Sequence, residues 1–201
     1  MKRNSIYAYL SIALWVFPFN NCCPMQNNFI ALPDSLSEEY KVYDVLINSM
    51  YVASDVKLIV IEDSTGVSTY RGGLETTMVY IKRHFDALEQ LTINNFIKKN
   101  VQRYRLGSWF CLKVEFTIIT RGEKNRIFRR GRGWDEFYEI YPNSQGILRL
   151  SKVSLNNKVN QAVVYVGNRE HWLGGKGYYV FLIKDNKGRW KVKDKVMIWV
   201  S

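Results

Sequence analysis

The last third of the chain restricts the fold most, because four strand-like runs follow one another there with short connections. The runs span residues 146–153, 162–166, 178–184 and 190–200. The connections contain the turn-forming sequences Asn156-Asn157, Gly174-Gly175 and Asp185-Asn186-Lys187-Gly188. Short links between successive strands favour antiparallel pairing, because a parallel connection needs a long crossover. This part of the sequence therefore predicts an antiparallel meander.

The first half of the chain has helical periodicity instead. Apolar residues recur at three- and four-residue steps over 36–50 and again over 74–88, and a shorter helical turn is expected at 94–99. Short apolar runs at 57–63 and 112–118 predict strands, and 134–142 predicts a short helix that ends at Pro142. The predicted fold class is α+β, with N-terminal helices packed on a C-terminal antiparallel β-sheet meander.

The N-terminus has the pattern of an export signal. Lys2 and Arg3 precede an apolar run over residues 6–17, which is too short to span a hydrocarbon core of about 30 Å as a helix. We therefore divide the chain into a signal peptide or short membrane anchor at 1–23, a linker at 24–34 and a single α+β domain at 35–201. A buried N-terminal helix is the alternative for the apolar run.

The cysteines leave two readings of this N-terminus. Cys22 or Cys23 would carry a lipid if the protein is a lipoprotein, and otherwise both leave with the signal. Cys111 lies in an apolar and basic stretch and is predicted to be a small buried hydrophobic residue rather than a nucleophile. With Cys111 alone in the body, no disulfide framework is expected within the mature chain.

The formal net charge of +11 is distributed unevenly. Residues 27–100 hold seven basic and ten acidic residues, whereas residues 101–201 hold 20 basic and eight acidic residues. The densest basic stretch is RGEKNRIFRRGRGW, which its glycines predict to be a mobile loop or hairpin tip. Its candidate anion-binding residues are Arg126, Arg129, Arg130 and Arg132, because guanidinium groups pair well with phosphate, sulfate and carboxylate groups.

Two interpretations of this basic stretch stay open. Its arginines either bind an anionic envelope polymer or lipid head groups, or they serve solubility and pair with the acidic helices. No nucleic acid is expected as a partner, since the chain carries no recognition-helix pattern or ribonucleoprotein motif and is expected to be exported.

Motifs for catalysis are weak. The chain has two histidines, His84 and His171, without metal-ligand spacing, and no nucleophile motif, so no catalytic residue, metal or cofactor is assigned. Asp135 and Glu139 would share one face of the short helix, which would suit glycosidic acid–base chemistry in a cleft. Acidic residues near a helix N-terminus are the simpler explanation.

A set of positions in the last 70 residues forms a recognisable pattern. They are Gly146, Ile147, Ser151, Val153, Asn156, Gln161, Ala162, Val164, Tyr165, Val166, Gly175, Gly177, Tyr178, Tyr179, Lys184, Gly188, Trp190, Lys191, Trp199 and Ser201. With this pattern the last 70 residues resemble a family of uncharacterised exported bacterial proteins, often lipoproteins. The upstream sequence from Trp134 to Pro142 resembles the lead-in of the same family. The chain departs from it at Ser154-Leu155, where a Gly-Phe pair is usual, and in lacking a cysteine pair within 168–176.

The resemblance implies an exported α+β protein, often anchored by lipid, and it implies no activity. The Gly-x-Trp-Lys-Val ending more loosely resembles a cystatin-type or nuclear-transport-factor-like cone, which is the runner-up architecture. The expected function is a non-enzymatic, envelope-associated binding or accessory module in the periplasm, cell envelope or extracellular space. The alternative is a hydrolase of a cell-envelope glycan that uses Asp135, Glu139 or His171.

Overall fold

The computed structural model describes residues 34–69 and 72–201 of the chain. The predicted signal peptide at 1–23 and all but the last residue of the predicted linker lie outside these residues. The described part belongs to one compact unit. Its elements are α1 (Asp34–Met50), β1 (Leu58–Glu62), α2 (Leu74–His84), α3 (Gln90–Lys99), β2 (Glu115–Ile119), α4 (Arg121–Asn125), the π-helical turn η2 (Arg126–Arg130), α5 (Trp134–Ile140), β3 (Ser144–Leu150), β4 (Ser154–Leu155), β5 (Gln161–His171), β6 (Gly174–Lys184) and β7 (Trp190–Val200).

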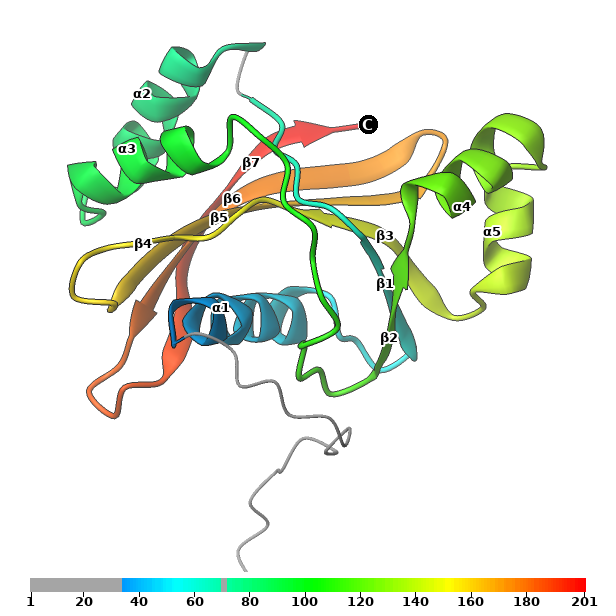
Figure 1. The fold of residues 1–201 in the computed structure, drawn as a ribbon, viewed down its shortest axis with the longest axis horizontal. Coiled ribbons are helices and arrows are strands. Elements are labelled where there is room, and N and C mark those ends of the chain that lie inside the picture. Colours follow the sequence, from blue (N-terminus) through cyan, green and yellow to red (C-terminus); the bar gives the residue numbers. More distant parts are fainter. Residues whose placement is uncertain (1–33, 70–71) are drawn as a thin grey trace, which may run out of the picture. The chain divides into compact units, whose positions relative to one another are not determined.

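A single sheet organises the described residues, with the strand order β2-β1-β3-β5-β6-β7 and β4 beside β5 (Figure 1). The four strands β3, β5, β6 and β7 pair with one another in antiparallel fashion, as the C-terminal sequence predicts. β1 pairs in parallel with both β2 and β3, and this pairing extends the meander at its β3 edge. The α+β fold class is confirmed.

Helix α1 covers one face of the sheet (Figure 1). Its apolar side chains, such as Tyr43 and Leu46, pack against inward-facing residues of several strands, among them Ile61, Leu148 and Val164. The four-residue spacing that predicted this helix corresponds to the face that is buried. Removal of this apolar surface from water is the main stabilising contribution of the helix.

Two separate groups of helices cover the opposite face. Helices α2 and α3 pack over β5 and β6 around Phe96, Tyr165 and Tyr179, and η2 and α5 pack over β1 and β3 around Ile127 and Phe137. Figure 1 shows these groups towards opposite ends of the sheet. The sheet face between the two groups carries the cavity described below.

The basic stretch after residue 120 is helical, so the predicted mobile loop is wrong. Thr120 caps α4 by accepting a hydrogen bond from the Glu123 N–H with its hydroxyl at 3.1 Å. Ile127 is fully buried and Phe128 packs on Trp134 at a ring separation of 4.8 Å. The buried Ile127 and the partly buried Phe128 within the arginine run order a segment whose composition indicates a loop.

The prediction for Cys111 is also wrong. Its side chain is exposed and takes part in a disulfide, so it is neither a buried hydrophobic residue nor a free thiol. Its backbone N–H donates a 2.8 Å hydrogen bond to the carboxylate of Asp44 on α1. The other two cysteines of the chain, Cys22 and Cys23, lie outside the described residues, as does any lipid attachment there.

None of the helices that the structure describes has an apolar stretch long enough to cross a bilayer.

Candidate functional site

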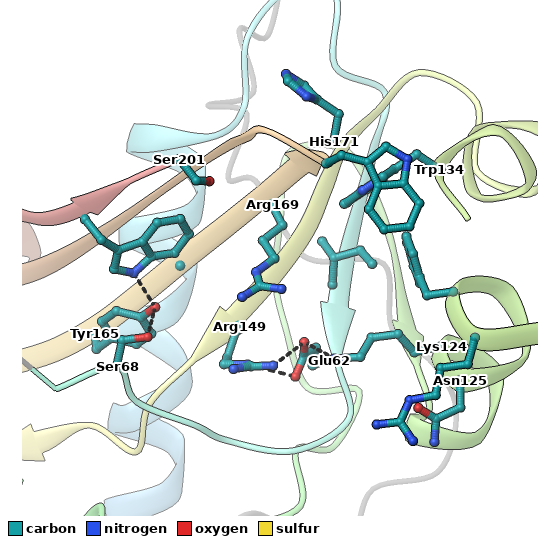
Figure 2. A pocket seen from close by; sticks show the side chains of 16 residues that line it. Glu62, Ser68, Lys124, Asn125, Trp134, Arg149, Tyr165, Arg169, His171 and Ser201 are labelled. Atoms are coloured by element: carbon teal, nitrogen blue, oxygen red, sulfur yellow. Dashed lines mark hydrogen bonds and ion pairs between the residues drawn. The ribbon is translucent and has the colours of Figure 1, made fainter. Parts of the chain in front are cut away.

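A cavity of about 590 Å³ lies on the sheet face between the two groups of helices. This volume is within the usual range of ligand-binding cavities. Its wall combines basic and aromatic side chains from strands and helices (Figure 2). The lining residues are Glu62, Ser68, Lys124, Asn125, Phe128, Arg129, Trp134, Ile147, Arg149, Tyr165, Gly167, Arg169, His171, Trp172, Trp199 and Ser201.

An ion-pair cluster forms one side of the cavity. Arg149 on β3 donates two hydrogen bonds of 3.0 Å to the two carboxylate oxygens of Glu62 on β1, and Lys124 on α4 donates one of 2.5 Å to Glu62 Oε1. Burial opposes the charge of Glu62, but the hydrogen bonds and charges of these two cations outweigh it and lower the pKa of the carboxyl group. Glu62 is therefore an ionised anchor that holds both cations in place.

Arg169 on β5 is the second strand-borne cation of the cavity. Figure 2 shows its guanidinium directed into the cavity, on the same side as Arg149. Arg169 is exposed and forms no ion pair with any described residue. Its five N–H donors are consequently free for a ligand.

Trp199 on β7 lies flat on a part of the sheet that lacks side chains. Ideal Cβ atoms built on Gly167, Gly175 and Gly177 would all come close to or overlap its indole, each at a different part of the ring system. The indole Nε1–H donates a 3.1 Å hydrogen bond to the Tyr165 hydroxyl, which fixes the ring in its plane. Trp199 thus has one face on the glycines and the other towards the cavity that it lines.

A second aromatic surface comes from the opposite group of elements. Trp172, in the turn between β5 and β6, is 69% exposed and packs edge-on against Phe128 of η2 at 6.4 Å. Its indole also covers Gly133, where a Cβ atom would approach to 2.6 Å. Trp134 is buried beneath, in contact with Phe128 at 4.8 Å. The cavity therefore has an aromatic residue at both ends.

The four predicted anion-binding arginines do not act as one cluster. Arg126 is paired with Glu136 at 2.6 Å, and Arg132 is paired with Glu139. Arg129 lines the cavity, whereas Arg130 is exposed, does not line it and pairs with no acidic residue that the structure describes. Pairing with an acidic helix thus accounts for two of the four, and only Arg129 reaches the cavity.

The residues of the hydrolase alternative are not brought together. His171 lines the cavity, but Asp135 and Glu139 do not. The pKa of Glu139 is lowered by its hydrogen bond from Arg132, which leaves this carboxylate ionised. Among the described residues, Glu62 is the only carboxylate side chain that lines the cavity.

Sequence reasoning missed Arg149 and Arg169, the two cations carried by strands. Each is separated by one residue from a partner on the same strand face, Ile147 before Arg149 and Gly167 before Arg169. A basic residue inside an otherwise apolar strand was therefore the available signal. The sequence alone does not show that the helices leave this part of the sheet uncovered, so a basic residue in a strand does not by itself indicate a binding site.

Neither a metal site nor a known relative assigns a function to the cavity. In the part of the chain that the structure describes, no group of three or more His, Cys, Asp or Glu residues could hold a metal ion. No protein-family model, curated protein or solved structure matches the chain.

Proposed function

We propose that this protein is an exported, non-enzymatic binding module of the cell envelope, and that its cavity binds an anionic group of an envelope component. The single observation that carries this proposal is the guanidinium of Arg169, which is directed into the cavity without an acidic partner. The proposed anion site thus lies on the sheet face beside the arginine run at 126–132, and not on the run itself.

The charge balance of the cavity supports an anionic ligand. Four cationic side chains line it, those of Lys124, Arg129, Arg149 and Arg169, against the single carboxylate of Glu62. Glu62 compensates part of this charge, so an excess of positive charge remains in a partly enclosed space. Electrostatic attraction is stronger there than at an open surface, because less water screens it.

The state of Glu62 favours binding over hydrolysis. Glycoside hydrolysis requires two carboxyl groups, one of which must be protonated near neutral pH. Glu62 is a single carboxylate whose pKa is lowered, and its oxygens are occupied by Arg149 and Lys124. A charged, saturated carboxylate is a poor proton donor.

The placement in the envelope rests on the N-terminal sequence and on the resemblance of the last 70 residues to exported proteins. Intact mass of the protein recovered from its host will distinguish cleaved, lipidated and uncleaved N-termini. A full-length, unmodified chain found only in the cytoplasm would contradict the proposed placement.

Retention on a sulfated dextran matrix tests the anion site. We expect Arg169→Ala to weaken binding about 10- to 150-fold, because a charge-assisted hydrogen-bonded contact is worth about 1.5–3 kcal/mol. Arg189→Ala is the matched control: it removes the same charge in the turn between β6 and β7, where Arg189 pairs with Asp185. Equal loss of retention in both variants would show a general charge effect and would refute the site.

A further inference from the structure

We propose that the ligand of the cavity is an acidic saccharide, in which a pyranose ring lies on Trp199 and its carboxylate binds Arg169. This inference rests on the proposed anion-binding function and names the class of ligand. It requires three features in one cavity: a flat apolar surface, a cationic site beside it and hydroxyl groups at its edge.

The flat surface is the indole of Trp199. Three glycines beneath it hold one face against the sheet, and the hydrogen bond to Tyr165 prevents rotation of the ring. Because the Nε1–H is already used, the ring offers the ligand its π-face rather than a polar edge. A pyranose ring has an apolar face of C–H groups, whose partial positive charge suits the negative face of an aromatic ring.

The cationic site, formed by Arg169 and Arg149, lies beside the Trp199 indole, which we call the platform. Arg169 is on β5, where Trp199 also contacts Gly167, two residues before Arg169 on the same strand face. Arg149 is on β3, which pairs with β5. Its Nε and one terminal nitrogen are used by Glu62, so the second terminal nitrogen remains for a ligand. Two guanidinium groups on neighbouring strands suit a planar carboxylate.

The hydroxyl groups belong to Tyr165 and Ser68. The Tyr165 hydroxyl donates to Ser68 Oγ at 3.0 Å, so the Ser68 hydroxyl hydrogen is left for a ligand oxygen. Tyr179 donates a 2.6 Å hydrogen bond to the Ser68 carbonyl and thereby holds the loop in place. Neutral hydroxyl partners at the platform edge suit the hydroxyl groups of a sugar, which both donate and accept.

Isothermal titration calorimetry of the full chain with four small probes tests the ligand class. D-glucuronate presents ring and acid together, acetate the acid alone, D-glucose the ring alone, and uridine 5′-monophosphate a flat base with a phosphate. We expect D-glucuronate to bind about tenfold or more tightly than acetate and D-glucose. Equal affinity for acetate, tighter binding of the nucleotide, or no binding of D-glucuronate would each overturn the saccharide assignment.

Substitution of the platform separates this inference from the proposed function. Trp199→Leu should lower the affinity for D-glucuronate about tenfold and leave the affinity for acetate, which has no ring, nearly unchanged. Trp109→Leu is the matched control, because Trp109 is 48% exposed and packs on Tyr40 of α1 instead. An unchanged D-glucuronate affinity in Trp199→Leu would refute the platform, whereas the Arg169→Ala retention result decides the anion site independently.

A conservative variant guards against misfolding of Trp199→Leu. Tyr165→Phe removes the hydroxyl that orients Trp199 and bonds to Ser68, and it retains the ring in the core. We expect its D-glucuronate affinity to fall severalfold with unchanged affinity for acetate. An unaltered affinity in this variant would contradict the role assigned to the Tyr165 and Ser68 hydroxyls.

Discussion

At the scale of single residues, Glu62 determines how the cations of the cavity are held. Its side chain is 12% exposed, and those of its partners Arg149 and Lys124 are just under one-third exposed. A carboxylate in this position must be paired, because an unpaired charge with this burial would be costly. Glu62 therefore orders the two cations and at the same time reduces the net charge that the ligand meets.

Glu62→Gln should destabilise the protein by about 1–3 kcal/mol at pH 7, since two partly buried cations lose their counter-charge. The pKa of Glu62 is lowered in the folded state, so its stabilising contribution is present above its ordinary pKa and is lost as pH falls through the folded pKa. The difference between the variant and the original protein should accordingly shrink in acid. Urea unfolding at pH 7 and pH 3 measures both; a constant difference would contradict the ion-pair explanation.

Asp44 on α1 shows the opposite shift. Burial raises its pKa to about 6, although the N–H of Cys111 donates a hydrogen bond to it. A raised folded-state pKa stabilises the protein below the ordinary pKa of aspartate, and this contribution is lost as pH rises through about 6.

Asp44→Asn should raise the stability above pH 6 by about 1–2 kcal/mol, because the amide oxygen can still accept from Cys111 without the cost of a partly buried charge. Thermal unfolding across pH 4–8 should show a flatter profile for the variant than for the original chain. A lower stability of the variant at pH 7 would indicate that the charge itself is needed at this position.

At the scale of elements, three glycines beneath Trp199 connect the pairing of β5, β6 and β7 with the shape of the cavity. They are Gly167 on β5 and Gly175 and Gly177 on β6, and we call them the glycine floor. Gly167 pairs with Gly177 in register, and Gly177 pairs with Trp199 on the next strand. A side chain at Gly177 would occupy the space of the indole. The glycine floor therefore determines how the Trp199 indole is oriented, in addition to allowing it to pack on the sheet.

Gly177→Ala should displace Trp199 and destabilise the protein by about 1–3 kcal/mol, the usual cost of overpacking. The emission of tryptophan should shift to longer wavelength as the indole becomes more exposed. Gly122→Ala is the control, because a Cβ atom in α4 would meet no described atom closer than 3.9 Å, and alanine is the better helix former. Similar losses in both variants would contradict the proposed overlap with Trp199.

At the scale of the whole molecule, the basic half of the chain contains two kinds of arginine. Those at 126 and 132 are paired with Glu136 and Glu139 on α5, and those at 129 and 130 have no acidic partner among the described residues. The double variants Arg129→Ala/Arg130→Ala and Arg126→Ala/Arg132→Ala remove the same charge, so a difference between them reports position rather than net charge.

We expect only the first double variant to lose salt-resistant retention on sulfated dextran, and the second to lose stability instead. Salt weakens the long-range attraction between the matrix and the net positive charge in both variants. Direct contacts of arginines with the matrix at the cavity add to this attraction. Elution in a salt gradient and thermal unfolding measure the two effects. Equal retention of the two double variants would show that only the net charge matters and would contradict a position-specific contribution of Arg129 and Arg130.

The sequence predicted most elements and little of their arrangement. The apolar periodicity of α1 and α2 and the turns between β5, β6 and β7 are local signals, and they were interpreted correctly. The loop predicted from residue 121 onwards is helical over 121–130, because the buried Ile127 and the partly buried Phe128 pack against α5 and outweigh a glycine- and arginine-rich composition. Of the cavity cations, only Arg129 was predicted from the sequence as an anion-binding candidate.

Local patterns by themselves determined the α+β class, the C-terminal meander and the excess of basic residues in its half of the chain. Tertiary structure alone decided that β1 joins β3 in parallel and that the helices leave one part of the sheet uncovered. That arrangement brings Glu62 and Arg149, 87 residues apart, into a two-bond ion pair beside Arg169. Periodicity records which face of an element is apolar, whereas the neighbours of that face depend on long-range packing.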